Sequence, residues 1–333
     1  MNRLKLTFAC GRYDRTEALR TGDVLVDGIE LNYVPIDAPR EIFDRMVKNR
    51  EFDLSELSSS EFISMKGRCD CPFVALPIFP SRVFRHGFIF VNKRAGIRSP
   101  KDLEGKRIGL PLYTQTAAIW IRGYLAHQYG VDLSTVTWVQ GAVEKPGSHG
   151  SPQPPPLLKP ARIEINESGY SLSDLLARGE IDALIGSRQP ETLEHADVGR
   201  LFPNYRDIER EFYKQTRIFP IMHLVAIRRD VYEQNPWIAG NLYSGFVRAK
   251  KWALDRMHFS ASTCYMLPWQ FYDVEEIDEI FGGDPWPYGI EKNRPTLSAL
   301  VQYMVEQDFI SRAIAIEDLF VPLPVPLLDG AGA

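Results

Sequence analysis

The chain has 333 residues, a length that corresponds to about two domains. Apolar residues make up 44% of it and charged residues 25%, which is typical of globular proteins and argues against a disordered chain. The net charge of −4 gives no electrostatic basis for binding nucleic acid.

The N-terminal part of the chain alternates segments with the patterns of strands and helices, an order typical of α/β folds. We expect strands at residues 4–9, 29–34 and 52–54, and helices at residues 14–20 and 39–47. The first apolar stretch is too short and too interrupted for the core of a signal peptide, and no window approaches the ~20 apolar residues that a membrane span needs. We therefore expect a cytoplasmic protein with no membrane partner.

The same alternation continues along the rest of the chain. We expect strands at residues 108–110, 136–139 and 181–185, and helices at residues 116–129, 172–178, 236–257, 274–281 and 296–306. Residues 146–160 contain six prolines and predict an exposed insertion.

Two strand-like segments, residues 82–91 and 219–227, each contain one histidine, His86 and His223. We expect these segments to join two α/β lobes. The first lobe would comprise residues 1–88 and 225–333, and the second residues 89–224. Folds of this kind bind ligands between the lobes, at the carboxyl ends of strands. The two histidines would then lie on the floor of the cleft.

Several segments resemble known proteins. Residues 99–109 and 175–183 are similar to the motifs that begin the second lobe, and that form a helix and strand, in type II periplasmic binding proteins. The sequence as a whole resembles the 4,5-dihydroxyphthalate decarboxylase family over roughly residues 3–322. The segments that carry this resemblance are residues 8–15, 52–58, 79–86 and 219–223. This resemblance implies conversion of 4,5-dihydroxyphthalate to protocatechuate and carbon dioxide in bacterial phthalate degradation. The partner would be a small aromatic dicarboxylate.

Such a reaction needs a proton donor for the ring carbon, a group that accepts or polarises the phenolic proton, and an anchor for the retained carboxylate. Histidine suits the proton donor because its pKa lies near neutrality, so His86 and His223 are our candidates. Glu56 is a candidate for accepting the phenolic proton or repelling the leaving carboxylate, and Tyr13 for a similar role. A structural histidine near a strand end is the alternative for each of the two histidines.

Arginine suits the carboxylate anchor, because its planar guanidinium binds carboxylates through two hydrogen bonds. The free amides at the start of the helix at residue 116 also form a natural anion site. The alternatives are surface charges, salt bridges between lobes and plain helix capping. The candidate binding residues are Arg12, Arg82, Arg85, Arg188, Ser58, Ser59, Ser60, Thr114, Gln115 and Thr116.

No nucleotide-binding or serine-hydrolase motif is present, and we expect catalysis without a cofactor. Cys69 and Cys71 form a CxC pair that lacks two further zinc ligands, and Glu191 with His195 lacks a third. Three alternative functions stay open: a solute-binding protein for an aromatic carboxylate, a decarboxylase of a related hydroxylated benzoate, and another biosynthetic enzyme on this fold. A homo-oligomer is compatible with the sequence.

Overall fold

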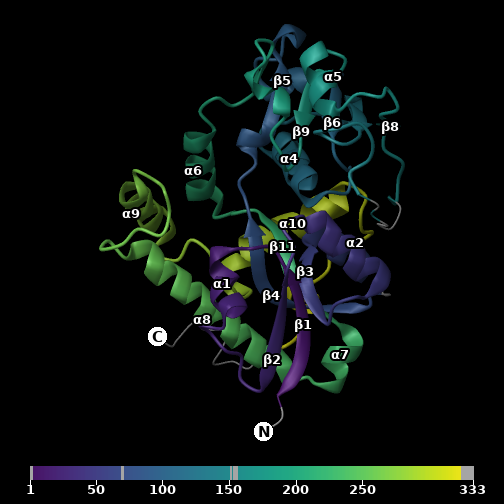
Figure 1. The fold of residues 1–333 in the computed structure, drawn as a ribbon. Coiled ribbons are helices and arrows are strands. Elements are labelled where there is room, and N and C mark those ends of the chain that lie inside the picture. The colour runs from purple at the N-terminus through teal and green to yellow at the C-terminus, as the bar shows by residue number, and fades with distance from the viewer. Residues whose placement is uncertain (1–2, 69–70, 151, 153–156, 324–333) are drawn as a thin grey trace.

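The computed structural model describes residues 3–68, 71–150, 152 and 157–323, so Cys69 and part of the proline-rich insertion lie outside the described residues. The strands within these ranges form two separate sheets, one of five strands and one of six. Figure 1 shows the sheets one above the other, with α4 and α10 between them. This arrangement agrees with the expected two-lobed α/β fold.

The first sheet has the order β2-β1-β3-β11-β4. Its strands are β1 (Leu4–Cys10), β2 (Ile29–Pro35), β3 (Leu54–Ser58), β4 (Phe73–Arg82) and β11 (Ile221–Arg228). β1 pairs in parallel with β2 and β3, whereas β11 runs antiparallel to β3 and β4. β11 returns to this sheet after the chain has built the second one, so two connections join the lobes.

The helices around the first sheet are α1 (Asp14–Thr21), α2 (Pro39–Asn49), α3 (Ser59–Lys66), α7 (Arg229–Gln234), α8 (Ile238–His258), α9 (Gln270–Phe281), α10 (Arg294–Glu306) and α11 (Ile316–Leu319). Every residue of β3 is buried because the strand lies in the middle of the sheet and α2 and α3 cover it. A charged residue of β3 is therefore held in a fixed, dry environment.

The second sheet has the order β10-β5-β9-β6-β7-β8. Its strands are β5 (Ile89–Asn92), β6 (Arg107–Leu110), β7 (Thr137–Gln140), β8 (Ile163–Ile165), β9 (Ala183–Ile185) and β10 (Val198–Arg200), and its helices are α4 (Thr116–His127), α5 (Leu172–Arg178) and α6 (Tyr205–Thr216). The strands from β5 to β10 all belong to the second sheet, and the strands before and after them belong to the first. The predicted lobe boundaries at residues 88 and 224 stay a prediction.

The connections differ in part from the expectation. The segment at residues 82–91 is not one strand: β4 ends at Arg82, a 3-10 turn spans His86–Phe88, and β5 starts at Ile89. α4 is buried around most of its circumference, including Arg122, because it contacts α3 and α10 of the first lobe. The periodicity that predicts a helix at residues 116–129 does not indicate this burial of Arg122.

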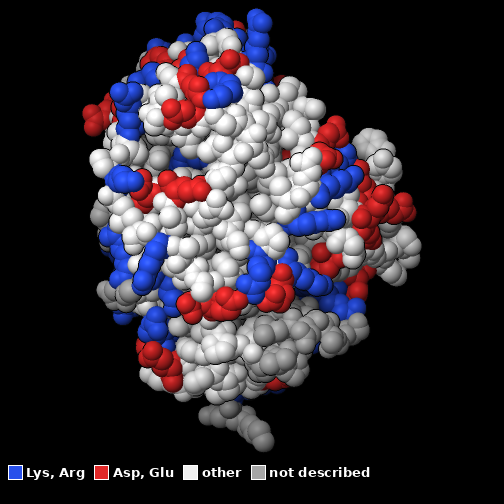
Figure 2. Space-filling view, turned by 180° about the vertical axis from the view of Figure 1, so that it is seen from behind, with Lys and Arg blue, Asp and Glu red and all other residues white. Residues whose placement is uncertain are grey.

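The surface carries both signs of charge. On the face shown in Figure 2, basic and acidic residues are interspersed around an uncharged area rather than gathered into a field of one sign. In the described part of the chain, no helix is long and apolar enough to cross a membrane.

Candidate functional site

A cavity of about 350 Å³ lies where β3 and β11 of the first sheet face the start of α4 and the loop after β9. Side chains from both lobes line it, including Tyr13, Ser58 and His223 from one and Gln115 and Arg188 from the other. The volume falls within the usual range for small-molecule sites, which is roughly 300 to 1,000 Å³.

His223 lines this cavity, and the buried Glu56 behind it forms a hydrogen bond with its ring. They lie on the neighbouring strands β3 and β11, and His223 Nδ1 is 2.5 Å from Glu56 Oε1. Tyr13 donates its hydroxyl to the same oxygen at 2.7 Å, and the Gly11 amide donates to Oε2 at 3.0 Å. The Glu56 side chain has no exposed surface, whereas 17% of the His223 side chain is exposed.

The surroundings of Glu56 favour its charged form. Burial by itself would raise the pKa of this carboxyl, but the His223 charge and the hydrogen bonds from His223, Tyr13 and Gly11 outweigh burial and lower the pKa. An ionised carboxylate only accepts hydrogen bonds, so Nδ1 of His223 carries a proton. The other ring nitrogen, Nε2, is then left for a ligand in the cavity, where it can exchange a proton.

Arg85 supplies a buried positive charge to the same cavity. Its guanidinium donates to the Ser187 carbonyl at 3.4 Å, while its Nε has no partner and no ion pair to it is found among the described residues. Burial lowers its pKa to about 10, which still leaves it charged near neutrality. A buried cation without a counter-ion is unfavourable, so this position is suited to an anionic ligand.

The N-terminus of α4 also faces the cavity. Gln115 is the N-cap, and its Nε2 donates to Ser187 Oγ at 3.0 Å while its buried Oε1 has no partner in the described chain. Thr116 Oγ1 lies 3.0 Å from Ser58 Oγ and 2.9 Å from Ser60 Oγ. These hydroxyls and the free amides of the first turn are donors of the kind that hold anions at helix N-termini.

Arg40 and His149 are among the lining residues that were not predicted from the sequence. Arg40, at the start of α2, pairs with Asp44 at 2.8 Å and with Glu61. His149 comes from the loop after β7. The Pro39 helix start could have drawn attention to Arg40, but His149 lies in a proline-rich stretch with no periodic pattern.

His86 does not lie on the cleft floor beside His223. It is fully buried and stacks on Tyr124 with ring centroids 4.6 Å apart, and Phe202 and Phe212 surround it. Burial lowers its pKa to about 4, so the ring is neutral near pH 7. The geometry favours the structural alternative for His86.

The anchor role predicted for Arg82 and Arg12 is not supported by their placement. Arg82 is buried away from the cavity, where it donates to Asn293 and to the Pro287 carbonyl. Arg12 is exposed and pairs with Asp37. Arg12 is therefore already paired, and Arg82, whose Nε has no partner in the described chain, does not line the cavity.

Of the other predicted binding residues, some line the cavity and some do not. Arg188 lines the cavity and pairs with Glu144 at 2.5 Å, with 47% of its side chain exposed. Thr114 contributes its carbonyl to Ser60 Oγ at 2.8 Å, and Ser59 is buried in the first turn of α3; neither lines the cavity.

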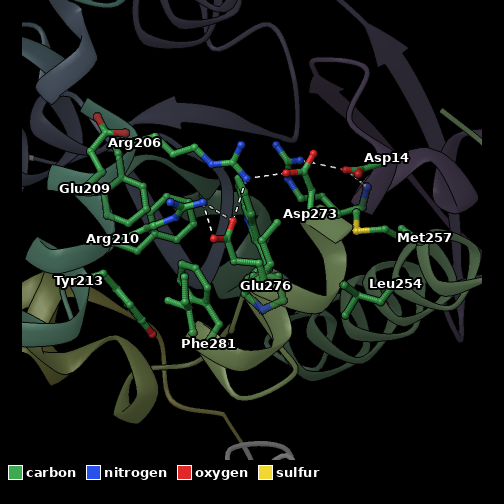
Figure 3. Close-up of a pocket in the computed structure, with 18 of the residues that line it drawn as sticks. Asp14, Arg206, Glu209, Arg210, Tyr213, Leu254, Met257, Asp273, Glu276 and Phe281 are labelled. Carbon is green, nitrogen blue, oxygen red and sulfur yellow. Dashed lines mark hydrogen bonds and ion pairs between the residues drawn. The ribbon is translucent and has the colours of Figure 1, made fainter. Parts of the chain in front are cut away.

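A larger cavity of about 540 Å³ lies between α6, α8 and α9 (Figure 3). Its wall is mostly apolar, and the charged groups at its rim pair with one another: Arg206 contacts Asp273 and Glu276, and Arg210 contacts Glu276. We place the chemistry in the smaller cavity, because that one contains an uncompensated cation and an acid–base pair.

No group of three or more His, Cys, Asp or Glu side chains is placed to hold a metal ion within the described ranges. Glu191 and His195 do not share a helix face, since the 3-10 turn there ends at Glu194 and His195 accepts from the Asp197 amide.

Comparisons with known proteins give relatives over nearly the whole chain. The chain is 35% identical over 326 residues to 4,5-dihydroxyphthalate decarboxylase of Comamonas testosteroni, which covers 97% of this chain and 98% of the relative. It is 37% identical over 218 residues to 4,5-dihydroxyphthalate decarboxylase of Pseudomonas putida, covering 64% of this chain and 83% of that one. The family model described as NMT1/THI5 like matches residues 28–145.

Solved structures with the same fold are much more distant in sequence. The periplasmic aliphatic sulphonate binding protein SsuA of Escherichia coli superposes with a TM-score of 0.54 at 12% identity, covering 96% of this chain and 92% of that one. The ligand-binding component of an ABC-type import system from Staphylococcus aureus gives 0.51 at 12% identity, covering 99% of both chains. These matches confirm the predicted two-lobed periplasmic-binding-protein fold, and at such identities they say nothing further.

Proposed function

Because this chain belongs to the 4,5-dihydroxyphthalate decarboxylase family and is therefore an enzyme, we propose that it converts 4,5-dihydroxyphthalate to protocatechuate and carbon dioxide. The proposal makes it a carbon–carbon lyase that acts on an aromatic dicarboxylate. The relatives' names support the reaction, and the cavity supports a way of carrying it out.

The chemistry avoids a free aryl carbanion. Each carboxylate-bearing carbon of the substrate has a hydroxyl group para to it. When that hydroxyl loses its proton, electron density moves into the ring and the carboxylate-bearing carbon can accept a proton. The carbon–carboxylate bond then breaks, and its electron pair restores the aromatic ring as carbon dioxide leaves.

The cavity has groups suited to both ends of this substrate. Glu56 is ionised and would repel a carboxylate, so the hydroxyl groups bind on the side of Glu56 and His223. His223 Nε2 takes the phenolic proton there, and Glu56 stabilises the resulting imidazolium. The carboxylate groups bind on the side of Arg85 and the first turn of α4, where donors are available.

The observation that carries the proposal is the buried, ionised Glu56 that holds His223 at the cavity wall. A protein that only bound an aromatic dicarboxylate would lose affinity by placing a buried negative charge beside its ligand. A carboxylate–imidazole pair is useful where a proton has to move. This favours the enzyme over the solute-binding alternative.

The test is turnover of 4,5-dihydroxyphthalate by purified protein, followed as protocatechuate by chromatography and as trapped carbon dioxide. In D₂O, we expect one deuterium at the ring carbon that lost its carboxylate. We expect His223→Gln to lower kcat by about 10²-fold or more, with a small change in substrate binding. Glu56→Gln should act in the same direction, because the neutral amide no longer stabilises the imidazolium.

His195→Gln is the matched control, since His195 is exposed and lies outside the cavity. Tight binding of the substrate without turnover would contradict the proposal and favour a solute-binding role. Full activity in both His223→Gln and Glu56→Gln would retain the reaction but remove this pair from it.

A further inference from the structure

The proposed reaction needs an acid at the ring carbon that loses carbon dioxide, and the cavity contains a second histidine that could serve. We infer that His149 is the catalytic acid that protonates this carbon, an inference that rests on the proposed function. His149 would then fill the proton-donor role for which His86 and His223 were the candidates predicted from the sequence. Three observations support it: its placement, its free ring and the charges beside it.

The loop that carries His149 is fixed against the opposite lobe. The Ala142 amide donates to the Gly147 carbonyl at 2.7 Å, which folds the loop back after β7. Gly150 has φ +72° and lies so close to α2 that a Cβ atom there would be 2.5 Å from Arg40 Cγ. Glycine at this position lets the backbone approach Arg40, and this contact holds the adjacent His149 at the cavity wall.

The His149 ring has no protein partner. In the part of the chain that the structure describes, no hydrogen bond or ion pair engages its nitrogens, whereas His127 pairs with Glu306 and His258 pairs with Asp278. A half-buried imidazole at a cavity wall with both nitrogens unengaged can contact a ligand directly. His223, by contrast, already uses Nδ1 for Glu56.

The charges around His149 come from both lobes. Arg188 and Arg40 are the cations beside it, and Asp44 and Glu144 are the carboxylates. Burial and the two guanidiniums lower the pKa of His149, and the two carboxylates only partly oppose this. The free enzyme therefore favours a neutral His149, beside two guanidiniums that are themselves paired with carboxylates.

Binding of the substrate would reverse this balance. The substrate carboxylates, bound on the side of Arg85 and the first turn of α4, bring negative charge into the same cavity. They offset the positive charges that disfavour the imidazolium, so the His149 pKa rises and the ring takes up a proton. The acid would thus be charged when its substrate is present. A benzoate with a single carboxylate would raise the His149 pKa less, which makes the dicarboxylate the favoured substrate class.

The step balances in atoms and electrons. A nitrogen–hydrogen bond of the His149 imidazolium breaks, and its proton forms a bond to the ring carbon using an electron pair of the ring. The carbon–carboxylate bond then breaks and returns an electron pair to the ring. The phenolic proton held on His223 goes back to the oxygen, and His149 recovers its proton from solvent, so each turnover consumes one proton.

Proton uptake can be measured without any turnover. Phthalate carries the two carboxylates but no hydroxyl group, so it can bind without reacting. Calorimetric titrations near pH 7 in two buffers of different ionisation enthalpy give the number of protons taken up per phthalate bound. We expect uptake of a fraction of a proton by the wild-type protein and by His127→Gln, and none by His149→Gln.

Turnover provides the second readout. We expect His149→Gln to lower kcat by about 10²-fold while it binds phthalate nearly as well as the wild-type protein does. Gly150→Ala keeps the histidine but pushes the loop off Arg40, so it should lower kcat as well. Melting temperatures close to that of the wild-type protein would show that both variants fold.

The outcomes separate this inference from the proposed function. Wild-type turnover with undiminished kcat in His149→Gln would overturn the role of His149 and leave the decarboxylase intact. Equal proton uptake in wild type and His149→Gln would also overturn it, because another group would then titrate. No turnover by the wild-type protein would overturn the proposed function and this inference together.

Discussion

Arg82 and Arg85 are three residues apart and both buried, but their surroundings predict opposite effects of substitution. Arg82 donates to Asn293 and to the Pro287 carbonyl. The Nε of each guanidinium has no partner in the described chain, but Arg85 lines the cavity and Arg82 does not. The first guanidinium completes a buried hydrogen-bond network, and the second is held in place for a ligand.

We therefore expect Arg85→Met to raise KM about tenfold or more while leaving the free energy of unfolding unchanged or higher. The substitution removes a hydrogen-bonded charge from the ligand, and it also removes a desolvated cation that makes no direct ion pair with the described residues. Arg82→Met should do the reverse, lowering the free energy of unfolding by about 1 to 3 kcal/mol with no change in KM, because Asn293 Oδ1 loses its donor.

Urea unfolding and steady-state kinetics on the two variants check this pair. A destabilised Arg85→Met with unchanged KM would mean that Arg85 supports the hinge instead of binding the ligand. A raised KM in Arg82→Met would place Arg82 in the binding machinery after all.

The sequence selected Glu56 and His223 separately, and the structure brings them together at the cavity, whereas Arg82 lies away from it; strand geometry explains the difference. Neighbouring strand residues point to opposite faces, so Ser81 lines the cavity while the adjacent Arg82 does not. A pattern that cannot fix this alternation to within one residue selects the wrong face as often as the right one. His86 was misplaced for a related reason, since a 3-10 turn replaces the expected strand there.

At the scale of single elements, α4 connects the binding site to the rest of the protein. Its first turn faces the cavity, and Trp120 donates from Nε1 to the Ile221 carbonyl of β11 at 2.9 Å. Near its C-terminal end, Gly123 allows the Tyr303 ring of α10 to approach so closely that a Cβ atom would lie 2.2 Å from it. The position of the helix therefore depends on this contact.

We expect Gly123→Ala to lower the free energy of unfolding by about 1 to 3 kcal/mol, because overpacking forces α4 and α10 apart. KM should also rise, since the displaced helix carries Gln115 and Thr116 at its other end. A double-mutant cycle with Tyr303→Ala, measured by urea unfolding, isolates the contact. Additive effects of the two substitutions would show that the helices do not clash and that the cost arises elsewhere.

Periodicity predicted where the helices lie in the sequence more accurately than it predicted which of their side chains are buried. The expected helix at residues 172–178 matches α5, and that at residues 296–306 lies within α10. The burial of Arg122 was not foreseen, because the hydrophobic pattern of one helix does not show that a second lobe covers its polar face. The connecting segments were the least predictable part, since their turns depend on contacts between the lobes.

At the scale of the whole molecule, a titratable contact holds the first connection between the lobes against α6 of the second lobe. The Gly87 amide, in the first connection, donates to a carboxylate oxygen of Glu209 in α6 at 3.1 Å. His86 lies beside Gly87 within the same connection. Burial lowers the pKa of His86 to about 4 and raises the pKa of Glu209 to about 7. Both groups therefore prefer to be neutral in the folded protein.

The two shifts make opposite contributions to stability as the pH falls. Below pH 6.5 the unfolded chain protonates its histidine before the folded protein protonates His86, so this group lowers the free energy of unfolding between pH 6.5 and 4. Below pH 7 the folded protein protonates Glu209 before the unfolded chain protonates its glutamate, so this group raises the free energy of unfolding between pH 7 and 4.5. The contributions offset each other in the overlap.

Replacing one of the two groups should leave the effect of the other on the pH dependence of stability unopposed. We expect Glu209→Gln, which keeps an acceptor for the Gly87 amide, to lose stability relative to the wild-type protein as the pH falls from 7 to 5. His86→Phe, which keeps the stack on Tyr124, should gain on the order of 2 kcal/mol relative to the wild-type protein between pH 6.5 and 4.5. Urea unfolding at four or five pH values measures both differences. Parallel pH profiles for all three proteins would mean that neither group has a shifted pKa, and the junction between the lobes would then be insensitive to pH in this range.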